Sequence, residues 1–354
     1  MDSTNRPAAT AARQIAAGMG AAALVAVAGL AYVKWWPYYH RILTVATTHR
    51  LGGSIFGPQG HFASVSLAAA WEYTVKYFQA VWQAAILGIV LGGAVEALLP
   101  ADWVERFLSG RGVRATLIAG ISALPGMMCS CCATPVVASL RRRNASAGAS
   151  FAFWMGNPVL NPATLAVLFL VLGWKFGLIR LIFGVVMVFG VSYGLDRLFP
   201  DENRPPQAAP ALVEVNLGRP EHWSLRWLRA SGRLAGWIVP EYLGMVLVTG
   251  LLGGYFFPAG IGTWTGTIPA LLLIALAGTL FVIPTMAEIP IVQGLMAIGL
   301  PPAPAAALLL TLPAVSLPSL IMLGRSFRRR TLVAVTLAVA LVGLAGGLAA
   351  AVLF

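Results

Sequence analysis

Apolar segments, each long enough for a helix of about 20 residues, recur along the whole chain and leave few places for charge. Of the 354 residues, 58% are hydrophobic and only 10% are charged. Inside a bilayer every backbone polar group needs a partner within the protein, which restricts spanning segments to helices and closed barrels. Segments of this length favour helices. The chain is therefore predicted to be an all-α polytopic membrane protein.

The formal net charge of +12 comes from bases that lie mostly between the apolar segments. This distribution is typical of the positive-inside rule, and no basic stripe interleaved with aromatic residues indicates nucleic-acid binding. We therefore expect contact with membrane lipid and no nucleic-acid partner. The clusters are Arg106, Arg111 and Arg114; Arg141, Arg142 and Arg143; the stretch from Arg197 to Arg233; and Arg325 with Arg328, Arg329 and Arg330.

The second half of the chain repeats the first at an offset of 155 residues (290 − 135). At this offset Pro290 falls on Pro135 and Pro313 on Pro158. An apolar chain that repeats itself, with polar residues at equivalent breaks, is typical of a transporter. Further identical pairs are Val292 with Val137, Leu295 with Leu140, Ala307 with Ala152, and Leu320 with Leu165.

The offset predicts two membrane repeats that follow a separate first helix. With seven crossings the amino terminus is cytoplasmic and the carboxyl terminus external, so the two repeats have inverted topology. We expect a first transmembrane helix (Ile15 to Val33) and an external loop in 1–77, repeat one in 78–199, a cytoplasmic linker in 200–236, and repeat two in 237–354.

Residues 113–143 are the most informative segment of repeat one. They are broken at Pro125-Gly126 and again near Pro135, and arginines flank both ends. A re-entrant hairpin keeps every arginine cytoplasmic, whereas a single crossing would place one cluster outside. The equivalent segment, 266–298, has no base at either end, as expected on the external side. We predict opposed hairpins whose tips, 125–135 and 280–290, meet near the midplane and line a cavity.

The first tip concentrates soft sulfur donors in Met128, Cys129, Cys131 and Cys132. Thiolates prefer soft, thiophilic centres, and three thiols that diverge on a regular helix can converge in an unwound tip. The alternative is that these cysteines pack as small hydrophobic side chains. The spacing lacks the second CxxC or histidine pair of a structural zinc site, and we expect no resident metal or cofactor.

Glu288 is the sole carboxylate in the second hairpin segment. At membrane depth it must be protonated, paired or hydrated, and a neutral-to-charged cycle there would serve proton coupling. A structural role for Glu288 is the alternative. Prolines also break the helix after each hairpin, at Asn157-Pro158 and Asn161-Pro162 in repeat one. The two amides, and the hydroxyl of Thr134, either satisfy freed backbone groups or contact a substrate.

Several of these motifs together resemble the ArsP-like predicted permease family over residues 78–354. They are Cys129-Ser130-Cys131, Thr134-Pro135, the run Arg141 to Ala149, Asn157-Pro158, and Asn161-Pro162-Ala163-Thr164. The resemblance implies an inner-membrane permease, with export of trivalent organoarsenicals by ArsP members, and assigns the cysteine motif to Cys129 and Cys131. The chain has Cys132 where the family commonly has glycine, and Asn144 where glycine is usual.

We therefore expect a secondary transporter that exports a soft, thiol-reactive small molecule, by proton antiport through Glu288. The absence of a GxxxxGK[ST] motif favours an ion gradient as the energy source. The alternatives are a permease for a sulfur compound or small anion, bound at helix amino termini near Cys131 and Glu288, and a channel. A thiol-redox enzyme lacks a visible cofactor motif, so no enzymatic activity is expected. Formation of a homo-oligomer stays open.

Overall fold

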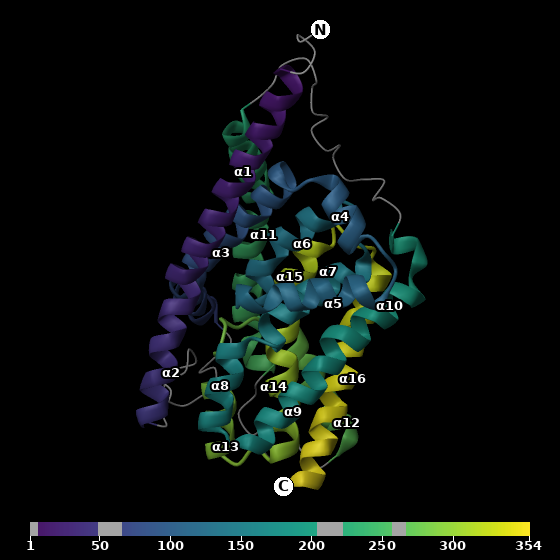
Figure 1. Cartoon of the computed structure of the whole chain (residues 1–354). Helices are drawn as coiled ribbons and strands as arrows, with labels where there is room; N and C mark the ends of the chain where they lie inside the picture. The colour runs from purple at the N-terminus through teal and green to yellow at the C-terminus, as the bar shows by residue number, and fades with distance from the viewer. Residues whose placement is uncertain (1–5, 49–65, 204–221, 257–266) are drawn as a thin grey trace.

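The computed structural model of the chain describes residues 6–48, 66–203, 222–256 and 267–354. Every regular element in these residues is a helix (Figure 1). Seven helices within the described residues are long and apolar enough to cross a membrane. The prediction of an all-α polytopic membrane protein is thus confirmed.

The amino-terminal helix is longer than predicted. Helix α1 (Arg6–Leu30) continues through the π-helix η1 (Ala31–Trp35) into α2 (Trp36–Thr48), and the three form one rod along the side of the molecule (Figure 1). The loop predicted from residue 35 is wrong as far as residue 48. Pro37 breaks an ordinary helix because its ring meets the carbonyl four residues earlier, and here that residue, Val33, lies in the widened π-turn. The rest of the predicted loop up to residue 65 lies outside the described residues.

Two long helices, α3 (Leu67–Leu98) and α11 (Trp223–Phe256), pack against each other. Both begin before the predicted positions, 78 and 237. The early turns of α11 carry arginines, which suggested a linker, but one face of the helix is apolar throughout. That face is buried at a spacing of four residues, at Ala230, Leu234, Ile238, Tyr242 and Val246.

Each of these long helices is followed by a pair of short ones. The first pair is α5 (Val113–Ala123) and α6 (Ser130–Arg142), preceded by the short helix α4 (Ala101–Leu108); the second is α12 (Ile268–Leu280) and α13 (Glu288–Ala297). Helix α5, with 11 residues, is about 16 Å long and α6, with 13, about 20 Å, against a hydrocarbon core of about 30 Å. Figure 1 shows α6 above the middle of the molecule, α5 close to the middle, and α12 and α13 near the bottom.

Broken helices follow in both halves. Helix α7 (Ala147–Val159) is interrupted before α8 (Pro162–Val171), and α14 (Pro302–Ala314) before α15 (Leu317–Leu323). The first half ends with α9 (Trp174–Val185), which continues through η3 (Val186–Val191) into α10 (Ser192–Leu198). The second half ends with α16 (Arg329–Leu353).

The helix boundaries follow the offset found in the sequence. Helix α14 begins 155 residues after α7 (302 − 147), α15 begins 155 after α8 (317 − 162), and α16 begins 155 after α9 (329 − 174). Residues that align at this offset therefore occupy equivalent positions on their helices.

The two halves are tied together on the arginine-rich side. The short helix η4 (Pro200–Asn203) places Glu202 so that its carboxylate accepts hydrogen bonds from the Arg328 backbone at 2.9 Å and the Thr331 hydroxyl at 2.6 Å. Arg141 donates to the backbone carbonyl of the same residue. Glu96, at the end of α3, pairs with Arg142 at 2.9 Å. These contacts fix the ends of α3, α6 and α16 on the arginine-rich side.

Candidate functional site

The first tip is the break between α5 and α6. Helix α5 passes into a single 3₁₀ turn, η2 (Leu124–Gly126), and Met127 then adopts a left-handed conformation with φ of 48°. The carbonyl of Pro125, freed by this break, accepts a hydrogen bond from the Trp35 indole of η1 at 2.8 Å. Helix α6 starts with Cys129 as its N-cap. The backbone is therefore unwound at the predicted Pro125-Gly126 break, and another helix satisfies part of it. The break predicted near Pro135 is wrong, because α6 continues through this residue.

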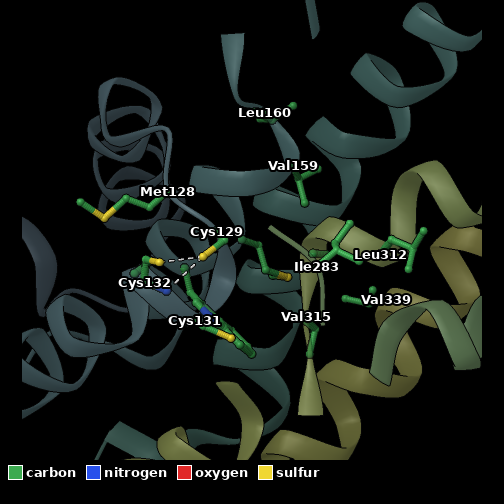
Figure 2. Packing of buried hydrophobic residues seen from close by; sticks show 14 of the residues in the cluster. Met128, Cys129, Cys131, Cys132, Val159, Leu160, Ile283, Leu312, Val315 and Val339 are labelled. Atoms are coloured by element: carbon green, nitrogen blue, oxygen red, sulfur yellow. Dashed lines mark hydrogen bonds between the residues drawn. The ribbon is translucent and has the colours of Figure 1, made fainter. Parts of the chain in front are cut away.

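Two of the three thiols form a close pair. The sulfur atoms of Cys129 and Cys132 are 2.8 Å apart, and the Cys132 backbone N–H donates to the Cys129 sulfur at 3.4 Å. Figure 2 shows these two sulfurs facing each other while Cys131 is directed away. The Cys131 sulfur lies 3.2 Å from the hydroxyl of Ser316, the N-cap of α15.

The expectation that all three thiols converge is therefore wrong. Because α6 is regular from Ser130 onward, Cys131 and Cys132 are adjacent helical residues and point in different directions. Only Cys132 lies one turn from the N-cap, on the same face as Cys129. Among the described residues, no group of three histidine, cysteine or acidic side chains is arranged to hold a metal ion.

The second tip carries Glu288 as the first residue of α13. Its carboxylate accepts a hydrogen bond from Nη1 of Arg180 on α9 at 2.8 Å, and both side chains are 1% exposed. Arg180 also donates from Nη2 to the carbonyl of Pro158 at 2.9 Å and from Nε to that of Val159 at 3.2 Å. The arginine thus links the carboxylate of the second tip to the end of α7, whose last carbonyls are freed by the helix break.

Cys129 and Glu288 line the same small cavity, of about 10 Å³. Two pairs of its lining residues are equivalent at the 155-residue offset: Cys129 with Pro284 (284 − 129), and Pro158 with Pro313 (313 − 158). The cavity is thus bounded by both tips and by the breaks that follow them. Its remaining lining residues are Ile283 and Thr285.

The other candidate residues have structural contacts instead of lining this cavity. The Asn157 carbonyl oxygen accepts from the Met128 backbone at 3.4 Å, and its amide donates to Phe153 at 2.9 Å. Asn161 caps α8 by accepting from the backbone of Ala163 at 3.0 Å. Its amide nitrogen has no partner among the described residues.

Thr134 and Met128 are also separated from the cavity. The Thr134 hydroxyl donates to the carbonyl of Ser130 within α6, at 2.9 Å. The side chain of Met128 is buried and extends away from the cysteine pair (Figure 2). The substrate contact that was expected of each side chain stays a prediction.

A second cavity, of about 160 Å³, lies between α3, α6 and α11. Cys131 and Cys132 belong to its wall, together with apolar side chains such as Trp82 and Ile86, which are each 53% exposed. Helix α3 approaches α6 closely beside this cavity, because a Cβ at Gly88 would lie 2.2 Å from the carbonyl oxygen of Cys132. Of the close pair, Cys129 thus lines the first cavity and Cys132 lines the second.

Sequence reasoning missed Arg180, Ser316 and Lys34. Arg180 is the sole charged residue between Lys175 and Asp196 in an apolar segment, and by the rule applied to Glu288 it should have been a candidate. Ser316 aligns with Asn161 at the repeat offset (316 − 161), which indicates a cap at the equivalent break. Lys34 is the sole charged residue between Arg13 and His40 and is 5% exposed.

Comparison with known proteins confirms the resemblance found in the motifs. Residues 123–352 match the family described as "Predicted permease" (ArsP_1). The chain is 45% identical over 327 residues to the UPF0718 protein YraQ of Escherichia coli (strain K12), covering 92% of this chain and 93% of that protein. It is 21% identical to the UPF0718 protein MJ0584 of Methanocaldococcus jannaschii, over 68% of this chain and 84% of that protein. No solved structure gives a significant match. The chain therefore belongs to the ArsP_1 family of predicted permeases and is a multi-pass membrane transporter.

Proposed function

We propose that this protein is an inner-membrane secondary transporter that exports a soft, thiol-reactive solute, with a trivalent organoarsenical as the first candidate. The observation that carries the proposal is the shared cavity of Cys129 and Glu288 between the two tips. A soft ligand atom and an ionisable carboxylate in one buried space supply a substrate site and a proton site that can influence each other.

The close pair Cys129 and Cys132 provides the substrate contact in this proposal. Trivalent arsenic bound to one organic group takes two thiols: an arsine oxide forms two arsenic–sulfur bonds and releases one water. Two sulfurs on one helical face, 2.8 Å apart, are well placed for such a ligand. Cys131, which contacts Ser316, serves the interface between α6 and α15.

Glu288 provides the proton step. Protonation removes the negative charge that holds Nη1 of Arg180, and Arg180 also holds the carbonyls of Pro158 and Val159 at the break after α7. Because Pro158 lines the cavity, the charge state of Glu288 is connected to the position of the cavity wall. Proton antiport through Glu288 is consistent with this connection.

The cavity must enlarge for transport. Its volume of about 10 Å³, which is room for about one water molecule, is far below the roughly 300–1,000 Å³ of typical ligand pockets. Enlargement requires movement of the tips or the breaks, which are the segments with the fewest helical hydrogen bonds. Opposed re-entrant hairpins, each entering from its own side, would allow this cavity to open alternately to the two faces.

A permease for a small anion is the second candidate. Helices α6 and α13 both begin at the cavity, with Cys129 and Glu288 at their amino termini, where backbone N–H groups favour negative charge. An anionic sulfur compound such as thiosulfate would use these groups and would depend little on the Cys129 thiol.

The deciding experiment is ligand-dependent thermal stabilisation of the purified protein by phenylarsine oxide or thiosulfate. At a ligand concentration of about 100 times Kd, the free energy of unfolding should rise by about 2.7 kcal/mol. We expect stabilisation by the arsenical in the wild type and in Cys131→Ser, and its loss in Cys129→Ser and Cys132→Ser. Stabilisation by thiosulfate alone, unchanged in all three variants, would instead support the anion permease.

A further inference from the structure

Lys34 is a buried ammonium group in the middle of the amino-terminal rod. It is 5% exposed, lies in the π-helix η1, and belongs to the candidate membrane span Ala16–Thr48. Its ammonium donates to the Tyr38 hydroxyl at 3.2 Å and lies 5.3 Å from the centre of the same ring. Among the described residues, no carboxylate forms an ion pair with it. A buried charge is strongly unfavourable without a counter-charge, so Lys34 needs a further partner.

The rod is docked where such a partner lies. The neighbouring Trp35 donates its indole hydrogen bond to Pro125, at the start of the first tip. The Lys34 ammonium is within electrostatic reach of both Cys129 and Cys132. These thiols are the groups near Lys34 that combine with a soft centre, and a thiolate or a thiolate-bound ligand carries the missing negative charge.

We propose that Lys34 is the counter-charge for a thiolate at the Cys129–Cys132 pair, and that the amino-terminal rod thereby contributes a residue to the substrate site. Three features converge on Cys129: the ammonium of Lys34, the N-terminal end of α6, and the backbone N–H of Cys132 directed at its sulfur. Cys131, also in the first turn of α6, is turned toward Ser316 and lacks the last of these features. Residues 123–352, which match the family model, do not include Lys34.

The assignment of Lys34 to a substrate site rests on the proposed function. The effect of Lys34 on the reactivity of the Cys129 thiol does not depend on transport. Several other titratable groups face the thiols or the adjoining cavity and stay unchanged in the test. They are Tyr38 on α2, Tyr77 on α3, Tyr242 on α11, Cys131 on α6, and the Glu288–Arg180 pair.

The test measures alkylation of Cys129 by iodoacetamide from pH 6 to pH 10, with mass spectrometry resolving the three cysteines. The thiolate displaces iodide, so the rate follows the thiolate population and its nucleophilicity. We expect loss of the ammonium in Lys34→Met to lower the thiolate population of Cys129 about tenfold at pH 7. The remaining thiolate is more nucleophilic, which offsets roughly half of this loss on the logarithmic scale. The alkylation rate at pH 7 should therefore be about threefold lower than in the wild type. The deficit should disappear by pH 10, and Lys34→Arg should restore the wild-type profile.

Two control variants separate charge from packing. Lys76→Met removes an exposed lysine that pairs with Glu72 on α3 and should leave the profile unchanged. Tyr38→Phe removes the hydrogen-bond partner of Lys34 but keeps the ammonium, and should retain the fast reaction. Equal rates and pH profiles for Cys129 in the wild type and a folded Lys34→Met, verified by gel filtration, would overturn the proposal. The arsenical experiment above would still stand, since it depends on the cysteines alone.

Discussion

The buried pair of Arg180 and Glu288 offers the sharpest test of the energetics of this site. Replacing Arg180 with methionine removes an ion pair and two hydrogen bonds to backbone carbonyls, in a place where each side chain is 1% exposed. Removal of one partner of a buried pair typically lowers the free energy of unfolding by about 3–5 kcal/mol, because the other charge stays buried without its partner. We expect Arg180→Met to fall in this range.

The contribution of the pair itself is measured by a double-mutant cycle with Glu288→Gln. Glutamine removes the charge, so in the double variant no carboxylate is left unpaired. The double variant should therefore be destabilised by less than the sum of the single variants, with a coupling of about 2–4 kcal/mol. Equilibrium unfolding in mixed detergent micelles measures all four free energies.

An exposed pair in the same protein provides the control. Arg325 pairs with Glu241, but the two side chains are 60% and 24% exposed. Arg325→Met should lower the free energy of unfolding by less than about 1 kcal/mol. If Arg180→Met and Arg325→Met had equal effects, or if the coupling at Glu288 were zero, the two buried charges would not stabilise each other as inferred here.

Two further predictions concern packing and topology. Gly88→Ala should lower the free energy of unfolding by about 1–3 kcal/mol, since the added methyl would meet the carbonyl of Cys132 at 2.2 Å. Gly244→Ala, whose methyl would meet nothing within 4 Å, should leave the free energy of unfolding unchanged. Equal stabilities of the two variants in chemical unfolding would contradict this. In intact cells, a membrane-impermeant maleimide should label Ile298→Cys but reach Asn144→Cys only after permeabilisation. Labelling of Asn144→Cys from outside, with the parent protein as the blank, would rule out opposed hairpins.

Much of the architecture could be predicted because it depends on local properties of the chain. Segment length and apolar composition indicated the membrane helices, and proline positions indicated the breaks near Pro125, Pro158 and Pro313. The break predicted near Pro135 is wrong because α6 accommodates this proline. Another error fell where one face of a helix is apolar and the rest is polar. The arginines at the start of α11 suggested a linker, although Ala230 and Leu234 already belong to its buried face.

The contacts of the site were harder to predict because they depend on which helices face each other. Arg180 and Glu288 are 108 residues apart, and nothing in either segment specifies its partner. Convergence of the three cysteines failed for a local reason, since α6 resumes directly at Ser130. The repeat offset nevertheless contained unused information, because it placed Ser316 at the same kind of cap as Asn161.

The same offset explains why one cavity can hold two kinds of chemistry. Position for position, Cys129 corresponds to Pro284, and Glu288 corresponds to Ala133 (288 − 133). The helix starts follow the offset but the reactive groups do not: the thiols belong to the first tip, and the carboxylate belongs to the second. A motion that separates the tips must change the distance between the thiol pair and Glu288. If substrate and proton bind at these groups, their coupling follows from dividing them between the two halves, and placing both on one tip would remove it.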